Sequence, residues 1–247
     1  MSADLFRPYK LSAAYRVHCA LNARWTECCG WRVPAAFGEA GAEAEASDVR
    51  RSVGLQDVSW FGKLDVKGTS VEEYRSACER IDEVRAVLPL KPGHALVLTT
   101  PGQEVQTIDA LVRVFDRAPG CMHVTETTSG LAAFALVGPQ SATVLSCLTS
   151  LDVRPEHFRD HACAQSSLAH VHATIYREDW GNLRGYLLLV NRDVGEFVWT
   201  TVQAAGDAFG LKPFGLDAER LLRAAEVSGR PRSMAPDAPL TVASRAS

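Results

Sequence analysis

The sequence predicts an α+β fold on three observations. Its 247 residues are 47% hydrophobic and 22% charged, a composition typical of a globular chain that buries a sizeable core. Strand-like and helix-like segments both occur, without the strict alternation that a doubly wound parallel sheet requires. The sequence also lacks an internal repeat and a long linker. Helices and strands are therefore expected to share one core.

The first third of the chain is predicted to begin and end with helices. Residues 10–24 carry apolar side chains at helical spacing, and 29–34 indicate a turn. Residues 38–51 hold good helix formers and stop before a glycine. In 62–68 apolar and charged residues alternate, which predicts a half-buried strand. A helix is expected to start near Val71, with Thr69 or Ser70 as its cap.

The middle of the chain is predicted to be mostly strands. Residues 88–92 indicate a connection, and 95–99 an apolar strand. After a Pro-Gly turn at 101–102, residues 105–115 alternate enough to predict a long strand. Another strand is expected at 122–126.

The last third is predicted to alternate between strands and helices before a polar tail. The expected strands are 134–137, 168–176 and 185–190, and the expected helices are 140–149, 193–208 and 216–227. The Pro- and Ser-bearing residues 228–247 are expected to be a disordered tail.

Composition argues against several classes of function. A net charge of −3 gives no electrostatic case for nucleic acid or an anionic membrane. No apolar run approaches the roughly 20 residues that span a bilayer, and the N-terminus has no signal-peptide core. We therefore expect a cytoplasmic protein with no nucleic-acid or membrane partner.

Cysteine and histidine patterns do not indicate a metal site. The seven cysteines form no CxxC pair, and the doublet Cys28–Cys29 is expected to be buried as small hydrophobic residues. His157 with His161, and His170 with His172, are spaced so that they could share a metal, but no carboxylate or cysteine completes the pattern. We expect no metal.

Four segments match, in order, the motifs of one protein family. They are GWRVP at 30–34, RSVGLQDVS at 51–59, FALVGPQSA at 134–142 and KPFGLDA with a following Leu-Arg pair at 212–223. Together they resemble the G-W-x-x-P, R-x-x-x-G-[LM]-x-D-[VL]-S, A-[LV]-Q-G-P-x-A and P-x-G-[LW]-x-A-R-D-x-L-R motifs of the glycine-cleavage T-protein, or aminomethyltransferase, family. Each motif alone is weak, and the order of all four carries the resemblance.

The resemblance implies a folate-binding fold of two intimately packed α/β subdomains. Residues 1–227 would form this domain, with one subdomain made of about 1–50 and 137–227 and the other of 51–136. The C-terminal barrel domain that usually follows in the family has no counterpart in these 247 residues, so we expect a fold without it.

The resemblance also implies a catalytic carboxylate. The family places it in a Gly-Gly-x-[IL]-Asp-Asp-[LM] strand beside the reactive folate nitrogen, and the best match here is VQTIDAL at 105–111. Asp109 then corresponds to the first Asp, while Ala110 replaces the second. An Asp in an apolar strand needs a partner or a ligand, so Asp109 is the predicted catalytic residue.

Four further residues are predicted to bind the cofactor tetrahydrofolate. In the family's Y-T-G-E-x-G-[YFW]-E segment, Asn182 takes the place of the pterin-binding Glu and Tyr186 that of the aromatic residue, with Glu178 or Asp179 as shifted substitutes. Leu96 or Val97 stands where the family has a Tyr, and Leu96 is the predicted cofactor-binding residue of the two. Arg223 is expected near the glutamate tail. The lost carboxylate favours weak folate binding.

Two functions are compatible with these features. The first is tetrahydrofolate-dependent transfer of an aminomethyl or methyl group from a small amine-derived substrate. The alternative is a non-catalytic or folate-site-sharing subunit of a heteromeric amine oxidase or demethylase, similar to the small subunit of sarcosine oxidase. In the second case a partner subunit would cover the open folate cavity.

Overall fold

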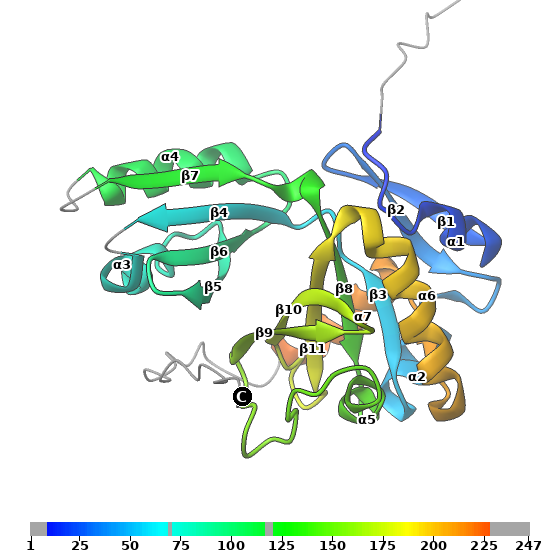
Figure 1. Ribbon diagram of the computed structural model, residues 1–247. Coiled ribbons are helices and arrows are strands. Elements are labelled where there is room, and N and C mark those ends of the chain that lie inside the picture. Colours follow the sequence, from blue (N-terminus) through cyan, green and yellow to red (C-terminus); the bar gives the residue numbers. More distant parts are fainter. Residues whose placement is uncertain (1–8, 69–70, 117–120, 228–247) are drawn as a thin grey trace, which may run out of the picture.

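The computed structural model describes residues 9–68, 71–116 and 121–227, and three sheets organise this part of the chain (Figure 1). The first is a hairpin of β1 (Ala23–Cys28) and β2 (Trp31–Phe37), which follows the short helix α1 (Tyr15–Ala20). The expected helix at 10–24 is therefore mostly wrong, and residues 31–34, expected in a turn, begin a strand.

A six-stranded sheet forms the centre of the molecule. Its strand order is β12-β3-β8-β11-β10-β9, and every neighbouring pair is antiparallel except β12 and β3. The strands are β3 (Gly54–Asp57), β8 (Leu131–Val137), β9 (Cys163–Leu168), β10 (Val171–Arg177), β11 (Gly185–Asn191) and β12 (Lys212–Pro213). The strands expected at 134–137 and 185–190 are confirmed. The one expected at 168–176 is a hairpin, because Ala169 and His170 turn the chain with positive φ.

A four-stranded sheet lies beside the central one and carries its own helices. Its order is β5-β6-β4-β7, all antiparallel. The strands are β4 (Gly62–Gly68), β5 (Val84–Lys91), β6 (His94–Thr99) and β7 (Met122–Glu126), and the helices are α3 (Val71–Cys78) and α4 (Glu104–Phe115). Leu64 and Val97 pack on one face of this sheet with Leu111 of α4 in a separate small core.

Two elements of the four-stranded half differ from expectation. Residues 105–115, predicted to be a strand, form helix α4. The buried positions of α4 are Thr107, Leu111 and Phe115, spaced by four, so burial follows the helical period although the residue types favour a strand. Residues 88–92, predicted to be a connection, mostly belong to β5.

The central sheet is covered on both faces. Helices α5 (Ser141–Ser146) and α6 (Gly195–Gly206) cover one face, and the core there includes Phe134 and Trp199, whose rings pack edge to face. The opposite face packs against β2, α2 (Gly41–Arg51), α7 (Leu216–Val227) and the four-stranded sheet. Short 3₁₀ turns are η1 (Thr128–Gly130), η2 (Arg192–Val194) and η3 (Asp207–Phe209).

The four-stranded sheet lies within residues 51–136, the range expected for one subdomain, but that range also contains two strands of the central sheet. Strands β3 and β8 belong to the central sheet, so the part built on the four-stranded sheet runs from Gly62 to Glu126. The predicted tail at 228–247 lies outside the described residues, as do the predicted caps Thr69 and Ser70. None of the helices in the described residues has the length and apolar character needed to cross a bilayer.

A buried lysine joins the two sheets. The chain passes from the central sheet to the four-stranded sheet at 58–61 and returns at 127–130. Lys63 is fully buried between these crossings, and its Nζ donates to the carbonyls of Ser59 (2.8 Å), Phe61 (2.9 Å) and Thr128 (3.3 Å). Burial lowers the pKa of Lys63 to about 7, although nearby carboxylates including Asp57 act in the opposite direction. One side chain therefore holds both crossings.

Replacing Lys63 with Met should destabilise the fold. The substitution leaves three carbonyls of the crossings without their donor, and each unpaired buried group costs about 1–3 kcal/mol. We expect the free energy of unfolding, measured by urea denaturation at neutral pH, to fall by at least about 2 kcal/mol. The control is Lys91→Met, at an exposed position, which should change stability by less than about 0.5 kcal/mol. Equal stability of the two variants would contradict the proposed role of Lys63.

Candidate functional site

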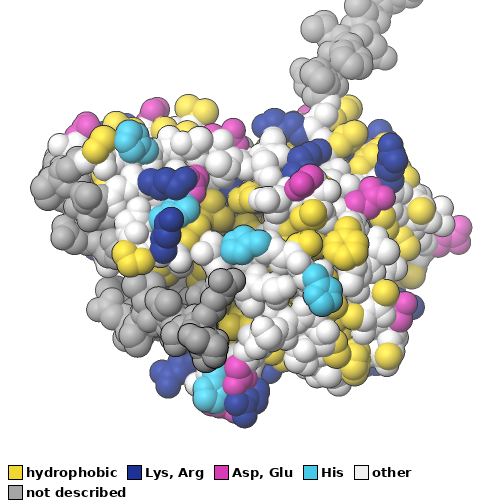
Figure 2. Space-filling view, in the orientation of Figure 1, with side chains coloured by type: hydrophobic (Ala, Val, Ile, Leu, Met, Phe, Trp, Pro, Cys, Tyr) yellow, Lys and Arg dark blue, Asp and Glu magenta, His cyan; other side chains and the backbone are white. Residues whose placement is uncertain are grey.

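A cavity of about 290 Å³ lies between the central and the four-stranded sheets. Figure 2 shows apolar side chains in the hollow between the two halves of the molecule, with histidine and basic side chains beside it. The cavity is lined by Asp65, Leu90, Leu96, Thr127, Gly130, Leu131, Gln165, His172, Thr174, Leu189, Val190 and Asn191. We call this the inter-sheet cavity.

Strand alternation determines which side chains face the cavity. In β4, Leu64 and Val66 turn toward α4, so Asp65 turns to the opposite face with its register partner Leu96 of β6. The facing wall comes from the central sheet, where Thr174 of β10 and Leu189 of β11 are register partners. The walls are thus leucine-rich and carry a few hydrogen-bonding groups, as small-molecule sites commonly do.

Asp65 is the carboxylate of the inter-sheet cavity, and two basic side chains hold it. Its Oδ1 lies 2.5 Å from His94 Nε2, and its Oδ2 lies 2.6 Å from Lys67 Nζ. Burial by itself would raise the pKa of Asp65, but the hydrogen bonds and charges of Lys67 and His94 outweigh burial, and the pKa is lowered. Asp65 therefore presents an ionised carboxylate in the cavity wall at neutral pH.

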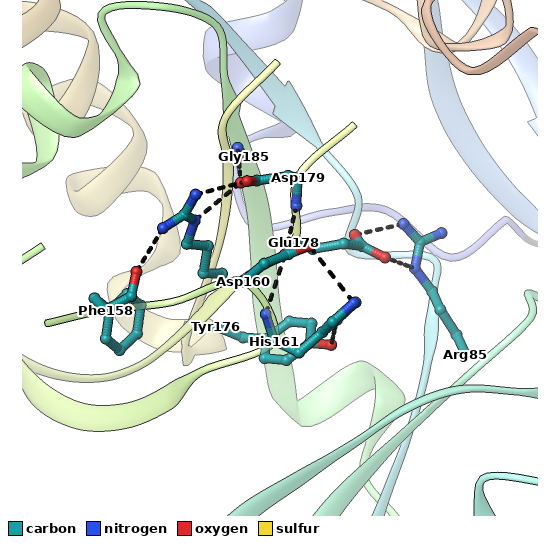
Figure 3. Close-up of polar contacts among 9 residues, drawn as sticks. Arg85, Phe158, Asp160, His161, Tyr176, Glu178, Asp179 and Gly185 are labelled. Atoms are coloured by element: carbon teal, nitrogen blue, oxygen red, sulfur yellow. Dashed lines mark hydrogen bonds and ion pairs between the residues drawn. The ribbon is translucent and has the colours of Figure 1, made fainter. Parts of the chain in front are cut away.

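A group of four charged side chains closes the space between the sheets at its other end. Along β10 the chain runs from Thr174 in the cavity to Glu178, just beyond the strand, and along β5 it runs back from Leu90 in the cavity to Arg85. Figure 3 shows Arg85 reaching Glu178 with two parallel hydrogen bonds, of 3.1 Å and 2.7 Å. We call Arg85, Glu178, Glu219 and Arg223 the charged cluster.

Helix α7 adds the second arginine of the charged cluster. Arg223 Nη2 lies 3.7 Å from Glu178 Oε2, and Arg223 Nε donates to Glu219 Oε1 at 2.9 Å. The other oxygen of Glu219 accepts from the buried Gln56 Nε2 at 2.7 Å. Three elements distant in sequence, β5, the β10–β11 connection and α7, therefore meet through these charges.

Aromatic rings support both guanidinium groups. Arg85 lies over the ring of Phe61 at 4.3 Å, and Arg223 lies over the ring of Trp180 at 3.9 Å. A planar guanidinium can stack on a ring and still donate in its own plane. The two arginines are thereby oriented to bind Glu178.

The charge state of Glu178 follows from these neighbours. Burial alone would raise its pKa, but the positive charges of Arg85 and Arg223 and the hydrogen bonds from Arg85 outweigh burial, so the pKa is lowered. The Glu178 side chain is 19% exposed. Its carboxylate is thus ionised and already engaged by two arginines.

Two of the sequence-predicted site residues lie between the sheets. Leu96 lines the inter-sheet cavity. Arg223 belongs to the charged cluster, where Glu178 and Glu219 engage its guanidinium. Glu178, considered from the sequence as a shifted pterin-binding carboxylate, instead pairs with Arg85.

The structure places Asn182 and Tyr186 away from the cavity. Asn182 is exposed in the short turn closed by the bridge between Trp180 and Leu183. Tyr186 points to the opposite face of the central sheet, where its ring stacks on Phe158 and its hydroxyl donates to the Val153 carbonyl at 3.2 Å. Tyr186, predicted to bind the cofactor, therefore does not line the inter-sheet cavity, because alternation in β11 sends its side chain to the other core.

Asp109 does not approach the cavity either. It is exposed on α4, and that helix packs on the face of the four-stranded sheet opposite to Leu96. The strand match on which its catalytic assignment depended is wrong, since the segment is helical. Asp65 is the cavity carboxylate that the sequence prediction missed. The alternation in 62–68 did separate Asp65 from Leu64 and Val66, but it could not show that the polar face lines a cavity.

Replacing Glu178 with a neutral residue should lower the free energy of unfolding by an amount that depends on pH. Because its folded-state pKa lies below the ordinary value of 4.5, Glu178 contributes stability above that pH and loses it as pH falls further. We expect Glu178→Gln to lower the free energy of unfolding at pH 7 by about 1–3 kcal/mol. The difference from the wild type should shrink as pH falls below 4.5.

The matched control is Glu156→Gln, whose exposed side chain lies 3.9 Å from Arg154. It should change stability by less than about 0.5 kcal/mol. Urea unfolding of both variants from pH 7 to pH 3 measures these differences. A Glu178→Gln deficit that stays constant over this range would contradict the assigned charge state.

Comparisons with known proteins agree with this architecture. Among curated proteins, the chain is 28% identical over 240 residues to an aminomethyltransferase of Desulforamulus reducens, covering 87% of this chain and 63% of that protein. It is also 28% identical over 253 residues to sarcosine oxidase subunit alpha of Corynebacterium sp. strain U-96, covering 90% of this chain and 26% of that protein. The chain spans less than two thirds of the length of these relatives.

Two solved structures share the fold. One is the glycine cleavage system aminomethyltransferase T of Bartonella henselae, with a TM-score of 0.68 at 19% identity, covering 87% of this chain and 62% of that one. The other is a chain of the heterotetrameric sarcosine oxidase of Corynebacterium sp. U-96, with a TM-score of 0.55 at 21% identity, covering 68% of this chain and 92% of that one.

The family itself follows from the sequence match together with this fold. The model of the GCVT N-terminal domain matches residues 14–81 and 82–228, which include both sheets, the inter-sheet cavity and the charged cluster. The chain therefore belongs to the GCVT N-terminal domain family.

Proposed function

We propose that the chain binds tetrahydrofolate through its pterin ring in the inter-sheet cavity and takes part in the transfer of a one-carbon group. The observation that carries this proposal is the cavity itself, between the two sheets of a GCVT N-terminal domain and with leucine walls and an ionised Asp65. The aminomethyltransferases among its relatives support the same class of reaction.

The cavity fits part of such a cofactor. Its volume of about 290 Å³ is at the lower end for small-molecule pockets, so it accommodates a ring system with the remainder of the ligand outside. Leu96 and Leu189 from opposite walls would sandwich the ring. Asn191, Thr174 and Gln165 offer both donors and acceptors to an edge with amide and amine groups.

Asp65 supplies the charge that the proposed reaction needs. Tetrahydrofolate, when bound, accepts the one-carbon unit on nitrogen. A nearby ionised carboxylate stabilises positive charge that develops there. Lys67 and His94 keep the Asp65 carboxylate ionised and fix its orientation. This role replaces the one expected for Asp109.

Recognition of the pterin edge in this chain would rest on neutral hydrogen bonds. Glu178 is engaged by Arg85 and Arg223, and a carboxylate engaged in this way does not add a charge-assisted pair to the ligand. We therefore propose affinity weaker than in a site with a free pterin-binding carboxylate.

Titration calorimetry with tetrahydrofolate under reducing conditions tests the site. We expect the wild type to bind tetrahydrofolate in the micromolar range. Asp65→Asn should bind it about tenfold more weakly, because the ligand loses a charged hydrogen-bond partner in the cavity wall. Gln165→Trp, at an exposed position of β9 that lines the cavity, should abolish binding by filling the space.

Asp109→Asn is the matched control for this experiment and should bind like the wild type, since Asp109 lies on the far side of the four-stranded sheet. Loss of affinity in Asp109→Asn with no change in Asp65→Asn would reject the cavity as the folate site. An absence of heat at millimolar ligand would reject folate binding by this chain.

A second candidate function is a subunit of a heteromeric amine-oxidising complex. The specific observation in its favour is that this fold covers 92% of one chain of a heterotetrameric sarcosine oxidase. A partner subunit that packs over the inter-sheet cavity would cover it and complete a folate or small-amine site. Under this proposal the charged cluster holds the two sheets in the arrangement that the partner meets.

Co-expression with the products of neighbouring genes distinguishes the two candidates. A complex that elutes as one species in size-exclusion chromatography, and that Gln165→Trp weakens, is expected if a partner packs over the cavity. A monomer that binds folate alone and co-elutes with none of these products would contradict the subunit function.

A further inference from the structure

The tip of the β1–β2 hairpin carries two adjacent cysteines. Cys29 and Gly30 have φ of 50° and 76°, the two positive values of a type I′ turn, which place Cys29 at the tip. Cys29 is exposed and Cys28 is partly exposed. The expectation that both are buried as small hydrophobic residues is therefore wrong for Cys29, whereas Cys28 is partly buried and packs against the core.

The two thiols are adjacent along the chain, and that of Cys29 contacts the neighbouring half of the molecule. Besides burial, the neighbouring Cys29 thiol raises the pKa of Cys28. Cys29 Sγ also donates to the carbonyl of Pro101 at 3.3 Å. A Cβ added to Gly102 would lie only 2.9 Å from Cys29 Sγ, so the sulfur packs closely on the turn that precedes α4.

We propose that Cys28 and Cys29 are a reversible redox modification site that forms a disulfide between adjacent residues when it reacts with a small-molecule disulfide such as oxidised glutathione. The thiolate of one cysteine attacks the small disulfide, forms a mixed disulfide and releases one small thiol. The second cysteine then attacks the mixed disulfide and releases the other small thiol. The protein loses two hydrogens and two electrons, and the small disulfide gains them.

The environment of each sulfur sets the order of attack. Burial raises the pKa of Cys28 to about 11, with a further contribution from Cys29, so Cys28 is rarely a thiolate at neutral pH. Cys29 is the more exposed thiol and is reached first. Cys28 then acts as the resolving thiol, and its position next to Cys29 at the hairpin turn compensates for its small thiolate fraction.

Backbone geometry makes such a bond easy to reduce. Consecutive Cα atoms are about 3.8 Å apart, whereas disulfide-linked residues usually have Cα atoms about 4.4–6.8 Å apart. The resulting strain raises the reduction potential, which is typical of labile disulfides and not of structural ones. The site therefore suits reversible modification.

Oxidation would also alter the contact between the hairpin and the other half of the molecule. The hydrogen that Cys29 Sγ donates to Pro101 is lost when the disulfide forms. The hairpin tip then loses its hydrogen bond to the turn at residues 100–103. We expect faster amide hydrogen exchange in this turn after oxidation.

Peptide mapping provides a direct test. Trypsin cleaves after Arg24 and Arg32, which places both cysteines in the single peptide Trp25–Arg32 with no other cysteine. The reduced full-length protein is incubated with oxidised glutathione, and free thiols are then blocked with N-ethylmaleimide. We expect this peptide to appear without a blocking group and lighter by two hydrogens, and dithiothreitol to restore both free thiols.

Variants separate the pair from general thiol oxidation. Cys29→Ser should abolish the lighter peptide, while Cys19→Ser, which removes another exposed cysteine, should leave it unchanged. The same treatment in urea should give at least severalfold less of the internal bond, because the folded turn holds the sulfurs together. Retention of glutathione on Cys29, blocking of both thiols, or linkage to another peptide as the main product would overturn the proposal.

Discussion

The relative position of the two sheets depends on one buried lysine. Lys63 binds carbonyls on both chain crossings, Ser59 and Phe61 on the outward one and Thr128 on the return. Its backbone adds to this, since Lys63 N donates to Thr128 Oγ1 and its carbonyl accepts from Thr127 N. An ammonium has three donors and no preferred plane, so it suits three carbonyls that converge from different directions. Because the inter-sheet cavity lies between these sheets, its shape follows from this contact.

The two ends of the space between the sheets differ in their side chains, since one is charged and the other is lined mainly by leucine. At one end Arg85 and Glu178 join β5 to the end of β10 with a bidentate pair stacked on Phe61. At the other end the same strands separate around Leu90 and Thr174, and the cavity opens. The ion pair closes the first end, and the leucine-lined space at the second end forms the inter-sheet cavity. The ion pair therefore acts on the cavity through the arrangement of the sheets.

Family resemblance placed Asp109 in a strand, but the structure places it in helix α4. Asp109 fitted a motif only if residues 105–115 formed a strand, and these residues favour strands by type. Tertiary packing decided otherwise, because Thr107, Leu111 and Phe115 bury one helical face against the four-stranded sheet. With that segment helical, Asp109 lies away from the inter-sheet cavity, and the carboxylate that lines the cavity is Asp65. Local propensity was too weak to oppose the burial of that face.

The sequence by itself determined the α+β class, the family and the two middle strands of the central sheet. The sequence predicts the buried strands at 134–137 and 185–190 correctly, because their apolar character does not depend on which neighbour covers them. Only the tertiary structure decided which face of each strand meets the other sheet. That choice put Leu96 and Asp65 in the cavity and sent Tyr186 to the opposite core. The physical reason is that a strand pattern defines two faces, and long-range packing alone assigns each face to a core, a cavity or solvent.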